Sequence, residues 1–190
     1  MINIRDERAT DVVARDNLLD QAYGAVRFTK TSERLREGRF PTKGLSLVAI
    51  ERGQIVGTIR FWPVTAGPGR PALLLGPLAV HPDHRNRGIG SALVSRALSR
   101  ARLGGYLAVL LVGDAAYYSR FGFTAEQTDG LWMPGRFERD RLLALELRPD
   151  ALAGACGLIG ATGEMQPRPD LKTLIAARSG TRRAPVRRAA

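Results

Sequence analysis

The sequence predicts an α/β domain, in which helices alternate with the strands of a sheet. Two observations carry this prediction. The runs LSLVAIE and QIVGTIRFW are separated by an Arg-Gly pair, which is typical of two antiparallel strands joined in a hairpin. Farther along, apolar runs at 72–80 and 106–112 flank a segment with the apolar spacing of a helix, residues 89–101. Helices interleaved with strands in this way indicate an α/β fold.

The N-terminal 40 residues predict one short strand and two helices. Residues 2–5 (INIR) have a strand-like pattern. Residues 10–24 predict a helix, because Thr10 or Asp11 is a suitable N-cap. The apolar stripe of this helix is expected to comprise Val12, Val13, Leu18, Leu19 and Ala22. Residues 31–40 predict a second, shorter helix that ends near Gly38.

The next segment predicts three strands, of which the last is interrupted. The hairpin strands are expected at 45–51 and 54–62, and the AGPGRP loop at 66–71 follows by composition. The run ALLLGPLAV at 72–80 is a strand that contains Gly76-Pro77. Because proline cannot donate to a strand ladder, the pair predicts a bulge or a local loss of pairing.

The remaining elements alternate again. Residues 89–101 predict an amphipathic helix, 106–112 a buried strand, and 115–121 one or two helical turns ended by Gly122. Residues 141–147 predict the last strand. The expected division is therefore a domain at 1–150, an extension rich in small residues at 151–166, and a basic tail at 167–190.

Composition limits the classes of protein. The chain has 190 residues, 44% hydrophobic and 25% charged, which is ordinary for a globular protein. The N-terminus is charged and the longest apolar run is too short to span a bilayer, so we expect no signal peptide and no membrane association. With a single cysteine, no internal disulfide can form, and the expected location is the reducing cytoplasm.

Positive charge is concentrated at the C-terminal end. The net charge is +11, and residues 167–190 hold seven basic residues against one aspartate. Such a tail is typical of a solvated, disordered end. The alternative interpretation is an electrostatic contact with nucleic acid or with an acidic partner.

The stretch HPDHRNRGIGSALV (81–94) has the features of a phosphate site. The first N–H groups of a helix have no partner within the helix and carry partial positive charge. Gly88 and Gly90 leave the start of this helix bare, and Arg85 and Arg87 supply guanidinium groups that suit phosphate oxygens. The stretch lacks the lysine of a triphosphate-binding loop and the third glycine of a dinucleotide fingerprint.

Arg85-Asn86-Arg87-Gly88-Ile89-Gly90 resembles the Arg/Gln-x-x-Gly-x-Gly/Ala signature of the GCN5-related N-acetyltransferases, the GNAT family. The whole run LAVHPDHRNRGIGSALV is similar to the strand-loop-helix segment of that family. Downstream, YYSRFGF resembles its second signature, a tyrosine four residues before Gly-Phe. LVGDAAYYSRFGF is similar to a bacterial subgroup of acetyltransferases whose substrate is unknown. The signatures cover about 45–125, and the order of elements extends the resemblance to about 1–147.

The resemblance implies an acyl-CoA N-acyltransferase-like fold. This is a mixed, mostly antiparallel sheet of six to seven strands, flanked by helices, with a splayed central pair of strands. It also implies acetyl-CoA as cosubstrate and no metal. Its pyrophosphate is expected on Arg85, Asn86, Arg87, Gly88, Ile89, Gly90 and Ser91, and its pantetheine arm beside Leu78, Ala79 and Val80.

The resemblance places Tyr118 at the position of the family's general acid. A phenol has an ordinary pKa near 10, so it is protonated at neutral pH and can donate to a leaving thiolate. An oxyanion donor is expected from a backbone N–H near Leu78. A packing role for Tyr118, with its hydroxyl bonded to a carbonyl, stays open as the alternative.

Other site residues have two interpretations each. Asp114 is either the N-cap of the following turn or a contact for the acceptor. Trp132, in the loop 130–137, either lines an acceptor pocket or covers the core. The two histidines, His81 and His84, have no ligand set around them that predicts a metal site. The general base is not identified among Glu51, Asp114, Glu126 and a water chain.

Two classes of function follow. The first is an acetyl-CoA-dependent N-acetyltransferase that transfers acetyl directly to a primary amine of a small molecule or a protein. The alternative is a non-catalytic module that binds acyl-CoA or a protein partner, with a basic tail that contacts nucleic acid. The sequence favours the enzyme and leaves open the acceptor and whether the chain is a monomer or a homodimer.

Overall fold

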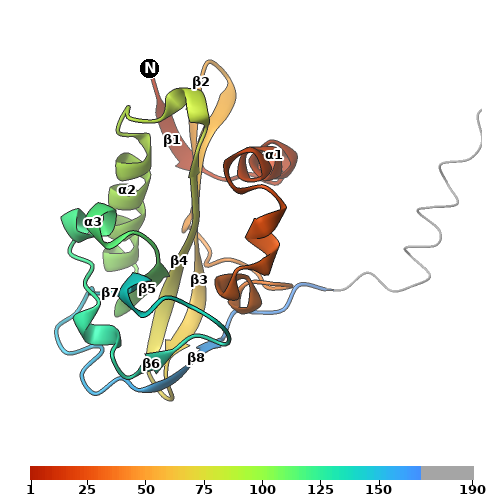
Figure 1. The fold of residues 1–190 in the computed structure, drawn as a ribbon. Coiled ribbons are helices and arrows are strands. Elements are labelled where there is room, and N and C mark those ends of the chain that lie inside the picture. Colours follow the sequence, from red (N-terminus) through yellow and green to blue (C-terminus); the bar gives the residue numbers. More distant parts are fainter. Residues whose placement is uncertain (168–190) are drawn as a thin grey trace, which may run out of the picture.

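The computed structural model describes residues 1–167. Its centre is a mixed, mostly antiparallel sheet of eight strands, in the order β1-β2-β3-β4-β5-β7, with β8 paired to β3 and β6 (Figure 1). Only β4 with β5, and β6 with β8, run parallel. The strands are β1 (Asn3–Asp6), β2 (Ser46–Glu51), β3 (Gln54–Ala66), β4 (Pro71–Val80), β5 (Ala108–Val112), β6 (Leu131–Trp132), β7 (Leu142–Glu146) and β8 (Gly157–Ala161).

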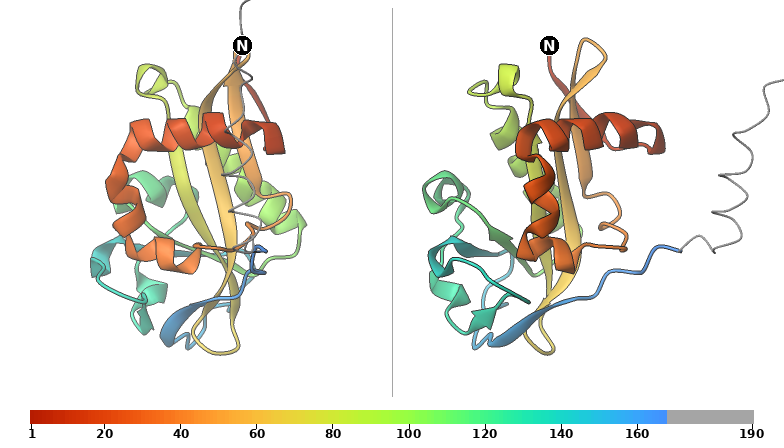
Figure 2. Two further views of the ribbon diagram at one scale, coloured as in Figure 1. Left: turned by 90° about the vertical axis from the view of Figure 1, so that its right-hand side faces the viewer. Right: turned by 45° about the vertical axis from the view of Figure 1, so that its right-hand side comes forward.

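Helices cover both faces of this sheet. In Figure 1, α2 and α3 lie on one side of the long strands β3 and β4, and α1 lies on the other; Figure 2 shows α1 crossing that second face. The α-helices are α1 (Val12–Tyr23), α2 (Ile89–Leu103) and α3 (Ala115–Tyr118). The 3-10 turns are η1 (Ala9–Asp11), η2 (Ala25–Thr29), η3 (Thr31–Leu35), η4 (Pro82–His84), η5 (Ser119–Phe121), η6 (Glu126–Thr128) and η7 (Arg139–Arg141).

The core follows the two-residue alternation of the strands. On β4, Leu73 and Leu75 pack into the cluster that includes Leu93 and Ala97 of α2. Leu74 lies on the opposite face, in a second cluster with buried side chains of β5 and β7. Alternate side chains of a strand point to opposite faces, so each central strand contributes to both clusters. The expected α/β fold with a mixed, mostly antiparallel sheet is confirmed.

The N-terminal helices differ from the prediction. In α1, Leu18 and Leu19 are buried, but Val12 and Val13 are 39% and 71% exposed, because only one side of the helix reaches the sheet. Asp11 precedes α1 but makes no side-chain cap, since its carboxylate accepts instead from Arg5.

The helix expected over 31–40 is only the 3-10 turn η3. Lys30, with extended backbone at φ −65° and ψ 136°, separates η3 from η2 and prevents one continuous helix.

The sheet has eight strands instead of the expected six to seven, because the structure adds the short β6, within the loop expected at 130–137, and β8. The sequence pattern predicted neither, and β8 is the longer of the two. It pairs with β3 at Val64, Thr65 and Ala66, so part of the segment 151–166 completes the sheet. The segment is glycine-rich, which lowers its intrinsic strand signal. The hypotheses on the basic tail 168–190 concern residues outside those that the structure describes. Within residues 1–167, no helix has the length and apolarity needed to cross a membrane.

Candidate functional site

The two central parallel strands separate in the middle of the sheet. β4 and β5 pair only at Leu73 with Val109 and at Leu74 with Leu110. On its other edge, β4 stays paired with β3, but between the partners of Ile59 and Phe61 it contains one extra residue. This bulge lies at Gly76-Pro77, as the sequence predicted, and the expected splayed pair of strands is β4 and β5.

Backbone groups of β4 face the resulting gap. His81 donates its N–H to the Val56 carbonyl at 2.9 Å, so this antiparallel pair is hydrogen-bonded. Hydrogen-bonded and non-hydrogen-bonded pairs alternate along an antiparallel ladder. The pairs formed by Val80 and Leu78 with β3 are therefore of the second kind. Their N–H and C=O groups point away from β3, toward the gap.

Ala79 does not belong to this group of backbone donors. It forms the intervening hydrogen-bonded pair with Thr58, so its N–H and C=O groups face β3. Its side chain is 4% exposed and packs against Leu18 and Leu19 of α1. Of the three residues predicted to contact the pantetheine arm, the geometry thus retains Leu78 and Val80 and gives Ala79 a packing role.

A cavity of about 430 Å³ lies where α2 begins. Gly88 has φ +74°, a conformation that favours glycine, and an added Cβ would have no atom within 4 Å. The bare turn therefore leaves room for a ligand at the helix N-terminus. The lining residues are Val80, His84, Arg85, Asn86, Gly88, Ile89, Gly90, Ser91, Tyr117 and Arg120.

Arg87 is absent from this lining, unlike its neighbours in the motif. Its guanidinium forms two hydrogen bonds with the Glu51 carboxylate, at 2.8 and 2.7 Å. His84 Nε2 lies 3.1 Å from the same carboxylate. The Arg87 hydrogen bonds are the main cause that lowers the pKa of Glu51 to about 2. Arg87 therefore holds the loop to the β2–β3 hairpin, whereas Arg85 faces the cavity.

Tyr118 lies at the gap between the strands. It lines a smaller cavity, of about 90 Å³, together with Leu78, Val112 and the Gly76-Pro77 bulge. Its ring fills the space beside Gly113, where an added Cβ would lie 2.5 Å from Tyr118 Cε2. Among the described residues, no group forms a hydrogen bond with its hydroxyl, so the interpretation that a carbonyl satisfies it finds no support. Burial raises the pKa of this phenol, which keeps it protonated at neutral pH.

Tyr23, at the end of α1, is a site residue that sequence reasoning missed. Its hydroxyl donates a hydrogen bond to the Leu78 carbonyl. It also lines the cavity in front of Tyr118. No sequence spacing links residues 23 and 78, so only the fold reveals this contact. Arg120 was missed for the same reason: it lies in the middle of the second motif and reaches the cavity at α2.

Asp114 and Trp132 are placed as follows. Asp114 caps α3, because its Oδ1 accepts from the N–H groups of Ala116 and Tyr117 at 2.8 and 3.3 Å. Trp132 is 58% exposed on β6 and lines neither cavity described above. The structure thus brings neither residue to the gap.

None of the three carboxylates considered as general base lines the cavity in front of Tyr118. Glu51 is paired with Arg87, Asp114 caps α3, and Glu126 lines a separate surface hollow with Asp129. Among the residues that the structure describes, no aspartate, glutamate or histidine lines the cavity in front of Tyr118. In residues 1–167, no three His, Cys, Asp or Glu side chains are grouped in a way that would bind a metal.

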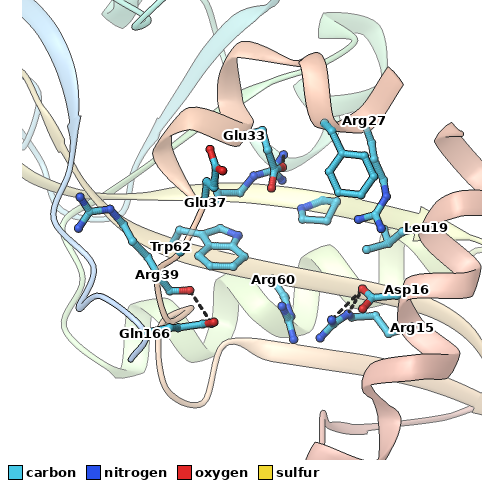
Figure 3. Close-up of a pocket in the computed structure, with 14 residues that line it drawn as sticks. Arg15, Asp16, Leu19, Arg27, Glu33, Glu37, Arg39, Arg60, Trp62 and Gln166 are labelled. Carbon is cyan, nitrogen blue, oxygen red and sulfur yellow. Dashed lines mark hydrogen bonds and ion pairs between the residues drawn. The ribbon is translucent and has the colours of Figure 1, made fainter. Parts of the chain in front are cut away.

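A third cavity, of about 370 Å³, opens on the face covered by α1. Figure 3 shows its wall, with Arg15, Asp16 and Leu19 of α1 on one side and Trp62 of β3 on another. Arg36 and Pro77 line both this cavity and the smaller one. The third cavity therefore adjoins the smaller cavity that Tyr118 lines.

Comparison with known proteins identifies the family of this chain. The acetyltransferase (GNAT) domain matches residues 42–125, which include both motifs. The chain is 33% identical over 157 residues to the uncharacterized N-acetyltransferase YhbS of Escherichia coli K12, covering 82% of this chain and 93% of that protein. The structure of E. coli YhbS in complex with CoA is similar, with a TM-score of 0.73, 32% identity, and coverage of 85% of this chain and 89% of that one.

A second solved structure supports the assignment. A GNAT family acetyltransferase from Brucella melitensis, in complex with acetyl-CoA, has a TM-score of 0.57 and 29% identity, covering 90% of this chain and 94% of that one. The sequence likeness to YhbS extends well beyond the matched domain and spans both motifs. The chain belongs to the GNAT family of acetyltransferases.

Proposed function

We propose that this chain is an acetyl-CoA-dependent N-acetyltransferase that transfers acetyl directly to a primary amine. The observation that carries the proposal is the gap between β4 and β5. There, backbone groups of Leu78 and Val80 point away from β3, and Tyr118 lines a cavity together with Leu78. A non-catalytic module would not need a tyrosine hydroxyl without a hydrogen-bond partner beside the edge of a strand.

The residues present fit acetyl-CoA as the cosubstrate. The cavity at α2 offers helix N–H groups, the guanidinium groups of Arg85 and Arg120, and the open space beside Gly88. These features suit a pyrophosphate. From there, Val80 and Leu78 lead along β4 to Tyr118, the direction that a pantetheine arm would follow. Two structural relatives were solved in complex with CoA and with acetyl-CoA, which supports this choice of cosubstrate.

The chain's own groups account for the reaction. When bound, acetyl-CoA supplies an acetyl thioester, and an acceptor amine attacks its carbonyl carbon. We assign the N–H of Leu78 to the carbonyl oxygen, where negative charge develops. We assign the Tyr118 hydroxyl as the acid that protonates the departing sulfur, a role typically worth about 10²–10⁴-fold in rate.

The acceptor must lose a proton before it can attack. The cavity in front of Tyr118 is lined by Arg27, Lys30 and Arg36, of which Arg27 and Arg36 form ion pairs and Lys30 does not, and by no carboxylate among residues 1–167. Nearby positive charge lowers the pKa of an ammonium group, so this cavity favours the neutral amine. We therefore propose that no dedicated side-chain base is needed, and that the proton leaves to water.

The test is the unfolding temperature with and without acetyl-CoA. At about 100 times the dissociation constant, binding adds about 2.7 kcal/mol, which corresponds to a rise of about 5–10 °C for a chain of this size. A Gly88→Val variant, which places a side chain in the open cradle, should fold but lose the rise. No rise at millimolar acetyl-CoA for the unmodified chain would overturn the proposal.

A further inference from the structure

The charged side chains in the walls of the two adjoining cavities indicate which acceptors fit. The smaller cavity, in front of Tyr118, has three cationic side chains in its wall, Arg27, Lys30 and Arg36. Arg27 is neutralised by Asp20, whose Oδ1 lies 2.8 Å from Arg27 Nε. Arg36 is likewise paired with Glu33, whose Oε2 lies 2.7 Å from Arg36 Nη2. The unbalanced positive charge therefore lies on Lys30.

Lys30 has no carboxylate within ion-pair distance among residues 1–167. Its ammonium lies 4.4 Å from the centre of the Tyr23 ring, which places it beside the hydroxyl that contacts Leu78. Partial burial, with Arg141 and Arg36 nearby, lowers its pKa. An anion bound here would relieve the repulsion between these cations.

Arg36 has hydrogen-bonding capacity that the protein does not use. Its side chain is only 7% exposed, and Nη2 donates to Glu33 at 2.7 Å and to Ser32 at 3.3 Å. Nε is buried without a partner. Within the part of the chain that the structure describes, Nη1 also has no hydrogen bond. An unsatisfied buried donor is costly, which points to a partner supplied from the cavity.

The free side of Arg36 lies close to the reaction centre. A Cβ placed on Gly76 would lie 3.5 Å from Arg36 Nη1. Gly76 is two residues before Leu78, within the bulge of β4. A ligand that spans from Arg36 to the Leu78 N–H therefore has an anionic group only a few bonds from its amine.

We propose that the acceptor is a free amino acid, whose carboxylate is held between Lys30 and Arg36 while its amine faces the gap. This inference rests on the proposed function. The larger cavity then takes the amino-acid side chain; its wall combines apolar residues such as Leu19 and Trp62 with charged residues of both signs, among them Asp16, Glu37 and Arg60. Polyamines meet repulsion from the same cations. The N-terminal residue of a peptide has no free carboxylate to occupy the position.

The experiment uses the wild-type chain and compares amines with and without a free carboxylate as acceptors. A panel of the twenty amino acids, their carboxamides, a polyamine and a lysine-containing peptide is incubated with acetyl-CoA, and acetylated products are identified by mass spectrometry. We expect transfer to one or more amino acids, with kcat/KM at least 10-fold above that of the matching carboxamide. Transfer only to carboxamides, polyamine or peptide, or to nothing in the panel, would overturn the inference.

Variants then test the two assigned residues. Lys30→Gln and Arg36→Met should each raise the KM for the amino acid about 10- to 100-fold, the usual value of a charge-assisted contact. The KM for acetyl-CoA should change little, and Arg36→Lys should recover part of the loss. Lys30 is exposed, so its variant stays informative if Arg36→Met does not fold.

The matched control is Arg34→Met. Arg34 lies in the same turn, donates to the Pro134 carbonyl at 2.7 Å and lines neither cavity. An equal rise in KM for Arg34→Met would count against a specific carboxylate site. The thermal shift with acetyl-CoA separates the two proposals, because its loss would overturn the acetyltransferase function, whereas its persistence without amino-acid turnover overturns only the acceptor.

Discussion

The hydroxyl of Tyr23 donates a hydrogen bond to the carbonyl of Leu78, and so ties the end of α1 to β4 just beyond its bulge. In an extended strand, the N–H and C=O of one residue point to the same edge. The phenol of Tyr23 therefore lies beside the N–H that we assign to the acetyl carbonyl oxygen. This one hydrogen bond therefore links the position of α1 to the position of the Leu78 N–H.

Replacing Tyr23 by phenylalanine should remove this link. We expect the free energy of unfolding to fall by about 1 kcal/mol, or about 2–4 °C in unfolding temperature, and the acceptor KM to rise. Tyr106→Phe is the matched control, because Tyr106 lies beside Gly104 at the end of α2, away from the cavities. Equal effects of the two substitutions on KM would show that the Tyr23 bond does not position the site.

Tyr118→Phe should lower kcat about 10²-fold or more and leave the thermal shift caused by acetyl-CoA nearly intact. The reason is that the hydroxyl is needed for proton donation, whereas the ring packs against the core in both proteins. The acid must be protonated, and burial raises its pKa above the ordinary value near 10. The kcat profile should therefore show no loss of activity from this group as the pH rises to 10.

Two results would contradict this role for Tyr118. One is unchanged kcat in Tyr118→Phe with the acceptor in hand. The other is a decline in kcat between pH 8 and 10 that disappears in the variant. Either would return Tyr118 to a packing role, and the leaving sulfur would need another acid, for which Tyr23 is the nearest phenol in the same cavity.

Gly90→Ala and Gly88→Ala should both destabilise the protein, but only the first should be rescued by Tyr117→Phe. A Cβ on Gly90 would lie 2.9 Å from the Tyr117 hydroxyl, whereas one on Gly88 meets no atom but has a strained φ of +74°. We expect Gly90→Ala to displace the Tyr117 hydroxyl and lower the unfolding temperature. In a Tyr117→Phe background it should be neutral or stabilising, because alanine is the better helix former.

Gly88→Ala should cost about 1–2 kcal/mol in either background, since its strain is in the backbone. Thermal unfolding of the four variants without ligand measures both expectations. If Tyr117→Phe rescued Gly88→Ala to the same extent as Gly90→Ala, the contact between Tyr117 and Gly90 would not be the cause.

Local patterns in the sequence predicted the parts of the fold that depend on neighbours along the chain. The apolar spacing of 89–101 became α2, with Leu93 and Ala97 buried, and Gly76-Pro77 became the bulge. The glycine-rich β8 had no such pattern. It pairs where Gly160 allows close approach, since an added Cβ would lie 3.0 Å from Thr65 Oγ1.

The candidate site also combines residues that short motifs predicted with residues that only the fold brings together. Arg85 and Tyr118 lie within short motifs, so their positions relative to α2 and α3 followed from the sequence. The partners that complete the site come from distant segments: Tyr23 contacts Leu78, and Arg36 approaches Gly76. The sequence also did not show that Arg85 lines the cavity and Arg87 does not, because Arg87 is held by Glu51, a residue of strand β2.

Arg85→Met and Arg87→Met should therefore have different effects. Arg85 lines the cavity at α2, so its loss should weaken acetyl-CoA binding about 10-fold or more. Arg87 is bonded to Glu51, so its loss should lower the unfolding temperature of the free protein and change the acetyl-CoA dissociation constant less than threefold. Titration calorimetry on both variants measures the contrast. Equal losses of affinity would mean that Arg87 leaves Glu51 to contact the cosubstrate.

The ion pair between Glu51 and Arg87 should also affect how the unfolding temperature changes at acidic pH. The pKa of Glu51 falls from an ordinary 4.5 to about 2 in the folded protein, chiefly through the Arg87 hydrogen bonds. Because the folded pKa is depressed, the contribution of the carboxylate is fully present above pH 4.5 and is lost as the pH falls toward 2. The difference in unfolding temperature between wild type and Glu51→Gln should thus be constant from pH 5 to 7 and shrink below that range. Added salt should reduce the difference at neutral pH, since exposed charges are screened. A difference that stayed the same from pH 7 to pH 3 would assign the effect of Glu51→Gln to packing instead of to the ion pair.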